Sequence, residues 1–241
     1  MPQIPVVLAS RSPRRLELLA RIVPAFLEAS SDVEDTGSDL MPEVPLDQLN
    51  LNPGFYVPPA SDPRLWAWRK AADVASSRVG SHPGNALFLG ADTVVLRREG
   101  PLGKPKSPAD ATDMLRSLRG TDHYVLTGVA ILSLAEHGFH TRALEVCASS
   151  VTMRDFSDME LEGYVETGEP MDKAGAYALQ GLGGALVETV QGCHTNVVGL
   201  PLCLVRTLLL KEGVEVLEAP PGRYCENCMD NSRLLHGPGS K

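Results

Sequence analysis

The pattern of apolar and polar residues along the first hundred positions predicts alternating strands and helices. Residues 6–9 are all apolar and run into a helix start, for which Ser12 is a suitable N-cap and Pro13 a suitable first residue. A second helix is predicted for residues 64–78. Residues 86–96 then form a nearly continuous apolar run, which is typical of a strand buried on both faces.

The second half of the chain continues this alternation. The predicted elements are a helix over 107–120 with Ser107 as N-cap, a hairpin of two strands over 123–134 and 141–153, a helix opened by the capping box Ser157–Glu160, a strand over 186–190 and a closing helix over 201–211. The residues around 180–184 are rich in glycine and predict a loop. The pattern therefore predicts an α/β fold.

Two segments break the pattern. The stretch 41–63 holds six prolines and cannot sustain a helix or a central strand, so we expect a surface insertion over about 37–63. After residue 217 the chain becomes polar, with two prolines and a glycine at positions 220–222. We therefore predict one domain over 1–217 and a loosely held tail over 218–241.

Composition narrows the class of protein. The formal net charge is −8 for 241 residues, with no basic stripe, so we expect no nucleic-acid partner. Since no apolar run approaches the roughly 20 residues of a membrane span, we expect no membrane partner. Five cysteines form an odd set that suits reduced thiols in the cytoplasm. Only Cys225 and Cys228 have metal-like spacing, which is a weak signal without a second pair.

A few charged residues stand where chemistry is expected. Arg14 and Arg15 lie at the first predicted helix start, where the helix dipole and backbone N–H groups favour phosphate, although a solvated helix face is an equal alternative. Asp92 interrupts an apolar strand and needs a partner, a metal ion or a cleft, unless it only satisfies a turn after Gly90. Lys104 comes shortly after the strand that contains Asp92, and a tight hairpin would bring it back toward the same end of that strand. Cations beside one carboxylate fit phosphoanhydride hydrolysis assisted by a divalent ion.

Four motifs in order resemble the Maf nucleotide pyrophosphatases. They are Leu8-Ala9-Ser10-Arg11-Ser12-Pro13-Arg14-Arg15, Gly90-Ala91-Asp92-Thr93, Gly103-Lys104-Pro105, and Glu169-Pro170-Met171-Asp172-Lys173-Ala174-Gly175 with Gln180-Gly181. The resemblance covers about residues 5 to 212. It implies a Maf/inosine-triphosphate-pyrophosphatase-like fold, with an elongated mixed sheet flanked by helices and two lobes around a central cleft. It further implies a homodimer that hydrolyses a nucleoside triphosphate to the monophosphate and pyrophosphate with Mg²⁺ or Mn²⁺.

The resemblance also implies a role for individual residues. Asp92 matches the proton acceptor that activates water. The positions that match phosphate-binding or pocket-shaping residues are Ser10, Arg14, Arg15, Lys70 and Lys104. Arg14, Thr93 and Gln180 resemble the branch that acts on dTTP and UTP, and a glutamine amide can pair with both a donor and an acceptor on a uracil or thymine edge.

Three points depart from the family pattern or stay open. The acidic motif ends in Asp35 where the family usually has glutamate, so either Glu34 or Asp35 is the expected metal ligand. The insertion is longer than usual, and the tail has no counterpart. The alternatives are a 7-methyl-GTP pyrophosphatase and a non-catalytic nucleotide-binding regulator of septum formation. Asp92 argues against the second, because a pure binding site gains little from a carboxylate near polyphosphate.

Overall fold

The structure is a computed structural model, which describes residues 4–33, 40–42, 46, 47, 49, 51, 53–78, 86–135 and 138–217. Glu34 and Asp35, one of which is the expected metal ligand, and the cysteine pair Cys225 and Cys228 lie outside the described residues. The predicted tail over 218–241 lies outside them as well, so the domain boundary at 217 stays a prediction.

The described residues form a succession of helices and strands that includes two pairs of consecutive strands and ends with two consecutive α-helices. The strands are β1 (Val6–Ala9), β2 (Leu27–Ala29), β3 (Leu87–Arg97), β4 (Gly100–Leu102), β5 (Asp122–Ala135), β6 (Gly138–Met153) and β7 (Val187–Gly192). The α-helices are α1 (Pro13–Ala20), α3 (Pro63–Ser76), α4 (Pro108–Leu118), α5 (Asp158–Glu166), α6 (His194–Val198) and α7 (Leu202–Lys211). Short 3₁₀ turns are η1 (Pro59–Ser61), η2 (Glu169–Asp172), η3 (Ala174–Ala176) and η4 (Leu182–Leu186).

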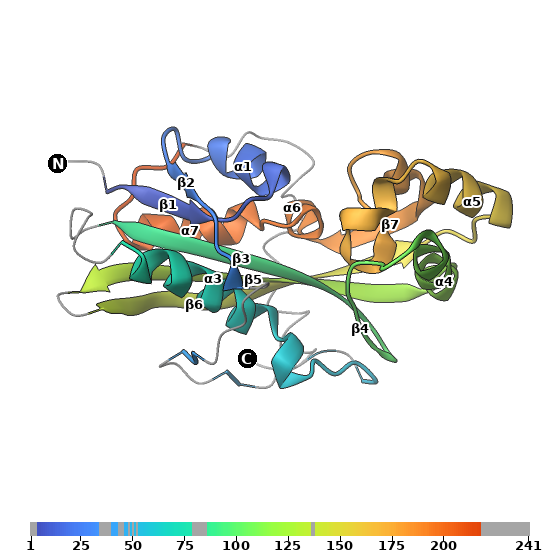
Figure 1. The fold of residues 1–241 in the computed structure, drawn as a ribbon, viewed down its shortest axis with the longest axis horizontal. Helices are drawn as coiled ribbons and strands as arrows, with labels where there is room; N and C mark the ends of the chain where they lie inside the picture. The colour runs from blue at the N-terminus through green and yellow to red at the C-terminus, as the bar shows by residue number, and fades with distance from the viewer. Residues whose placement is uncertain are drawn as a thin grey trace.

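One mixed sheet runs the length of the molecule. Its order is β2-β1-β3-β5-β6-β7, with β4 paired to β3 beside this path. β1 pairs in parallel with β2 and β3, whereas β3, β5, β6 and β7 pair antiparallel in succession. The long strands β3, β5 and β6 connect an end that carries β1, β2, α1 and α7 with an end that carries α4, α5 and β7 (Figure 1). The expected elongated mixed sheet flanked by helices is confirmed.

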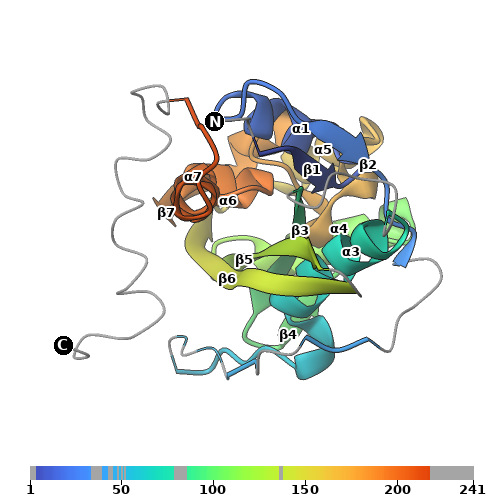
Figure 2. The ribbon, with the colours of Figure 1, turned by 90° about the vertical axis from the view of Figure 1, so that its left-hand side faces the viewer.

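The core lies on both faces of this sheet. Leu8 and Leu89 pack with α1 and α7, while their neighbours Val7 and Phe88 pack with α3, as the alternation of side chains along a strand requires. Figure 2 looks along the long strands, with α7 and α3 on opposite sides of them. A third cluster fills the far end between β3, α4 and α5. Residues 86–96 are apolar nearly throughout because both faces of β3 are covered.

Two glycines set how closely α3 approaches the sheet. A Cβ atom at Gly90 would lie 2.0 Å from the carbonyl oxygen of Ala67, and one at Gly128 would lie 2.3 Å from the backbone of Pro63. Gly128 pairs with Asp92 across β3 and β5. The missing side chains therefore let the backbone of α3 lie directly on the sheet beside Asp92, and Lys70 follows Ala67 by one turn.

Most predicted elements are confirmed, with small shifts at their ends. Ser107 caps α4, and the capping box Ser157–Glu160 opens α5, as expected. The prediction for Ser12 is wrong in one respect, because Ser12 holds the N-cap position of α1 without a capping side-chain hydrogen bond. The short helix α6 and the 3₁₀ turns η2 to η4 were not predicted. Within the described part of the chain, no helix is both long and apolar enough to span a membrane.

The described part of the insertion has no strand, as its prolines predict. It contains the 3₁₀ turn η1, which is followed by Asp62. The carboxylate of Asp62 accepts a hydrogen bond of 2.8 Å from the backbone N–H of Arg64. This contact caps α3, the helix that carries Lys70. The insertion therefore ends by fixing the start of a helix that borders the cleft.

Candidate functional site

The site lies where β1 leaves the sheet. β1 runs beside β3 up to the pair Ala9 and Gly90, and the chain then turns into α1 while β3 continues to Arg97. Beyond Gly90, therefore, none of the described strands pairs with β3 on its β1 side until β4 joins it at Val95. The side chains of Asp92 and Thr93 border the cleft formed at this fork, which has a volume of about 730 Å³.

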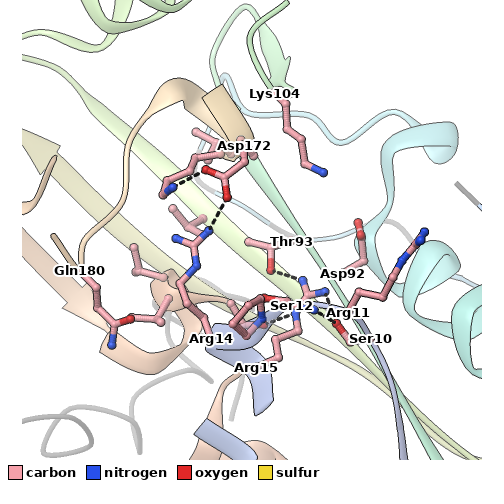
Figure 3. Close-up of a pocket in the computed structure, with 18 of the residues that line it drawn as sticks. Ser10, Arg11, Ser12, Arg14, Arg15, Asp92, Thr93, Lys104, Asp172 and Gln180 are labelled. Atoms are coloured by element: carbon pink, nitrogen blue, oxygen red, sulfur yellow. Dashed lines mark hydrogen bonds and ion pairs between the residues drawn. The ribbon is translucent and has the colours of Figure 1, made fainter. Parts of the chain in front are cut away.

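The cleft gathers most of the residues that the sequence singled out. Those that line it are Ser10, Arg14, Arg15, Lys70, Asp92, Thr93, Lys104 and Gln180. They come from the β1–α1 junction, α3, β3, the loop after β4 and the glycine-rich loop, and Figure 3 shows most of them arranged around one space. Only Glu34 and Asp35, which lie outside the described residues, cannot be placed.

Asp92 is held by Lys70. The Lys70 Nζ donates to Asp92 Oδ1 over 2.7 Å, and the side chains are 10% and 18% exposed, respectively. The alternative of a turn after Gly90 is wrong, because residues 87–97 form one continuous strand. A carboxylate that borders the cleft, with its charge balanced by a fixed ammonium, can orient and deprotonate a water molecule there.

The two arginines differ in their surroundings, although they are adjacent in sequence. Arg14 extends across the cleft toward Asp172 of η2, with 3.9 Å between Nη2 and Oδ2, and its side chain is 31% exposed (Figure 3). Arg15 instead donates from Nε to the carbonyl of Gly199 (2.9 Å) and from Nη2 to Thr93 Oγ1 (3.1 Å). The sequence did not distinguish them, because both were assigned to the same phosphate-facing helix start.

Ser10 supports this junction from the end of β1. Its Oγ accepts the backbone N–H of Ser12 over 3.2 Å and a longer contact of 3.5 Å from Arg15 Nη1. Ser10 is 7% exposed. Its hydroxyl therefore shapes the turn from β1 into α1 and helps to orient Arg15.

The opposite wall of the cleft carries charges of both signs. Partial burial favours the neutral form of Asp172, but the hydrogen bond and charge of Lys173, together with the charge of Arg14, outweigh it and hold the pKa of Asp172 below its usual range. Lys173 Nζ also donates to the carbonyl of Glu169 over 2.8 Å. Lys104 follows the β3–β4 hairpin, as the sequence predicted, and reaches the cleft from there. An anionic substrate would thus meet cations on both walls.

Glu169 fixes the loop that presents Gln180. Its carboxylate accepts the backbone N–H groups of Leu182 and Gly183, each over 3.1 Å, and the hydroxyl of Tyr164 over 3.1 Å. Burial, followed by the charge of Glu169, raises the pKa of Tyr164 above its ordinary value. No role for Glu169 was predicted, because a carboxylate that serves backbone donors leaves no periodic signal in a sequence.

Behind the cleft, Tyr177 is supported by a buried histidine. Tyr177 lines the cleft, and its hydroxyl lies 2.7 Å from Nε2 of His123, which is fully buried on β5. Burial lowers the pKa of His123 to about 4, against the opposing effect of the Asp122 charge. Burial also raises the pKa of Tyr177. Both groups are therefore neutral near pH 7.

The donor set near Asp92 fits a divalent ion that is shared with a substrate. Within the described ranges, no group of three or more His, Cys, Asp or Glu side chains is arranged to hold a metal ion alone. Mg²⁺ in phosphoryl-transfer sites is commonly held by one or two carboxylates together with substrate phosphates. Asp92 supplies one such carboxylate, and the cations that line the cleft suit the substrate phosphates that would supply the other ligands. The roles of Glu34 and Asp35 stay predictions.

Comparison with known proteins gives consistent matches. A family model described as "Maf-like protein" matches residues 5–212. The chain is 41% identical over 212 residues to a dTTP/UTP pyrophosphatase of Dictyoglomus turgidum, covering 88% of this chain and 98% of that relative. It is 39% identical over 214 residues to one of Pelotomaculum thermopropionicum (88% and 98%) and 41% identical over 200 residues to one of Geobacter sulfurreducens (83% and 92%). The family match includes every cleft residue described above.

Proposed function

The chain belongs to the Maf family, and on that basis we propose that it hydrolyses nucleoside triphosphates, dTTP and UTP in particular, to the monophosphate and pyrophosphate. One observation carries the proposal: a single cleft brings Arg14, Lys104 and the Lys70–Asp92 pair together at the end of β1. Cations on two walls suit a polyphosphate, and the carboxylate between them suits a water molecule. The relatives named above carry this activity in their names.

In this proposal Asp92 is the catalytic base. It accepts a proton from the water that attacks the α-phosphorus, and pyrophosphate leaves as the bond from the α-phosphorus to the bridging oxygen breaks. Lys70 is a positioning residue, because its ammonium holds one oxygen of the carboxylate over 2.7 Å. Arg14 and Lys104 hold the departing phosphates from opposite walls.

A divalent cation, Mg²⁺ or Mn²⁺, is part of the proposal. When bound, it would spread the negative charge of the phosphates and assist the attack on phosphorus. Asp92 would hold it within the described residues, and Glu34 or Asp35 would complete its ligands. This arrangement predicts that a chelator stops hydrolysis and that either cation restores it.

Gln180 is the proposed reader of the base. A glutamine amide offers both an NH2 donor group and a carbonyl acceptor, which matches the alternating edge of uracil or thymine. Glu169 holds the neighbouring backbone, so the amide is presented from a fixed loop. We therefore expect pyrimidine nucleotides to be preferred over 7-methyl-GTP. The cytoplasmic location, the homodimer and the lack of nucleic-acid and membrane partners belong to the same proposal.

Product analysis tests the reaction directly. Purified protein is incubated with dTTP, UTP or 7-methyl-GTP and with Mg²⁺ or Mn²⁺, and the products are separated by ion-exchange chromatography. We expect a monophosphate and pyrophosphate from dTTP and UTP. Orthophosphate with a diphosphate would contradict the reaction, and a preference for 7-methyl-GTP would contradict the assigned substrate. Binding of the nucleotides without turnover would favour the alternative of a non-catalytic nucleotide-binding regulator.

A substitution at Asp92 tests the base. Asp92→Asn keeps the shape and one oxygen facing Lys70 but cannot accept the proton, so we expect kcat to fall about 10³-fold, as for a lost general base. Binding of dTTP should persist in calorimetry. Asp113→Asn, at a side chain 80% exposed on α4, is the matched control and should retain full activity. Turnover by Asp92→Asn near that of the control would remove Asp92 from this role.

A further inference from the structure

A chain of hydrogen bonds runs from the cleft into the core through two threonines. Arg15 Nη2 donates to Thr93 Oγ1 over 3.1 Å, the hydroxyls of Thr93 and Thr127 lie 3.0 Å apart, and Thr127 Oγ1 donates to the carbonyl of Asn196 over 3.1 Å. Thr127 and Asn196 are both fully buried. The chain therefore connects a cleft residue on α1 with α6 through paired residues of β3 and β5.

The far end of this chain is firmly anchored. Asn196 Nδ2 donates to the carbonyl of Val125 on β5 over 2.8 Å and to Ser149 Oγ on β6 over 2.9 Å. Gly199, directly after α6, accepts Arg15 Nε over 2.9 Å and donates its N–H to the Asn196 carbonyl over 2.9 Å. The bonds thus close a ring that joins α1, β3, β5 and α6.

Hydrogen counting gives the ring a direction. A threonine hydroxyl has one hydrogen, and an arginine side chain only donates. Without a hydrogen between them, the buried oxygens of Thr127 and Asn196 would repel each other at 3.1 Å, so the hydrogen of Thr127 is used there. Thr127 must then accept from Thr93, and Thr93 in turn accepts from Arg15.

This direction changes the role of Thr93. Its only hydrogen points away from the cleft toward Thr127, so Thr93 presents an acceptor to Arg15 and has no donor for a phosphate or base oxygen. We propose that Thr127, a buried residue behind the cleft, is a positioning residue that sets the hydrogen-bond direction at Thr93 and thereby orients the Arg15 guanidinium for a substrate phosphate. The proposal rests on the function above, since it needs a phosphate in the cleft.

The energetic reason is preorganisation. An unrestrained arginine loses rotamer freedom when it binds a phosphate, whereas one already held at Nε and Nη2 has lost that freedom on folding. Breaking the ring at Thr127 frees the hydrogen of Thr93 to point toward Arg15, where it opposes the N–H of Nη2. The Arg15 guanidinium then leaves the orientation in which Gly199 and Thr93 hold it, and its affinity for a phosphate falls.

Thr127→Val and Thr127→Ser separate the hydroxyl from the shape. Valine matches threonine in size without the hydroxyl, and serine keeps the hydroxyl. For Thr127→Val we expect the Kd of inorganic pyrophosphate, measured by calorimetry, and the KM of dTTP to rise about tenfold, the equivalent of about 1.4 kcal/mol for one lost buried hydrogen bond. We expect a smaller change in kcat, because Asp92 and Lys70 lie on the other face of β3. Thr127→Ser should stay within about threefold of the unaltered protein.

Controls separate positioning from general destabilisation. Thr141→Val removes a hydroxyl that accepts Trp68 Nε1 over 2.9 Å on β6, away from the cleft, and should leave pyrophosphate binding unchanged. Because Thr127 acts through Thr93, the double variant Thr93→Val/Thr127→Val should bind pyrophosphate no more weakly than Thr93→Val alone. If Thr127→Val does not fold, Thr93→Val and Thr93→Ser test the same ring, and equal pyrophosphate affinity in these two would overturn the proposal.

The outcomes distinguish this inference from the proposed function. If the unaltered protein neither binds pyrophosphate nor hydrolyses dTTP, the proposed function fails. If it does both and Thr127→Val binds pyrophosphate equally well, only the role of Thr127 is overturned. A loss in Thr127→Val that Thr127→Ser does not share, with Thr141→Val unaffected, supports the positioning role.

Discussion

His123 should make the stability of this protein fall on mild acidification. The ring is fully buried on β5, and Nε2 lies 2.7 Å from the hydroxyl of Tyr177, while Nδ1 is buried without a hydrogen-bond partner in the described structure. Protonation would place a charge in this apolar setting. Burial accordingly lowers the pKa of His123 from 6.5 to about 4 in the folded protein.

The sign and size of the effect follow from proton linkage. Between pH 6.5 and about 4 the unfolded chain binds a proton at His123 and the folded protein does not, so the free energy of unfolding falls as the pH falls. Above pH 6.5 His123 is neutral in both the folded and the unfolded chain, so the free energy of unfolding loses nothing to its protonation. At 1.36 kcal/mol for each pKa unit, about 3 kcal/mol is lost over the whole window, and about 2 kcal/mol of it by about pH 5.

Urea denaturation at about pH 7.5 and about pH 5 measures this loss. His123→Gln removes the titrating group and keeps an amide that can bond to Tyr177, so its stability should fall by about 2 kcal/mol less between the two values than that of the unaltered protein. His140→Gln, on the exposed side of β6, is the matched control and should keep the full pH dependence. Equal pH dependence in the unaltered protein and His123→Gln would refute the reasoning.

Two further predictions concern the loop of Gln180 and the approach of α3. Glu169→Gln turns an amide donor toward the N–H of Leu182 or Gly183 and so disturbs the loop that presents Gln180, and we expect the KM of UTP to rise about tenfold. An unchanged KM of UTP in steady-state assays would argue against this role of Glu169. Gly128→Ala should lower the free energy of unfolding by about 3 kcal/mol in urea, because its Cβ meets α3, whereas Gly163→Ala, in open space on α5, should not destabilise.

Local patterns were sufficient for much of this fold. The apolar run that became β3, the caps at Ser107 and Ser157 and the hairpin of β5 and β6 depend on residues close together in sequence, which is where periodicity and capping carry information. Asp92 was recognisable for the opposite reason, since a carboxylate within an apolar strand contradicts its surroundings. The described structure places it in β3 and pairs it with Lys70.

Contacts between distant residues could not be predicted in the same way. Thr127 and the Asn196 carbonyl are 69 positions apart, and Arg15 and Gly199 are 184 apart. Each residue alone is an ordinary member of its element, and only the folded sheet brings them together. The helix α6 was missed for a related reason: with five residues, it is too short to show a period of 3.6.

The alternation of β3 explains why neighbouring residues could acquire different tasks. Successive side chains of a strand point to opposite faces, so Asp92 meets Lys70 of α3 on one face while Thr93 meets Arg15 of α1 on the other. Gly90 and Gly128 admit α3 on the first face only, and this fixes which face each residue takes. Shifting β3 by one residue would move Asp92 to the Arg15 side and place a side chain against α3. The close packing of α3 therefore fixes the register that places Asp92, the proposed base, and Arg15, the arginine proposed to bind a phosphate, in one cleft from opposite faces of the sheet.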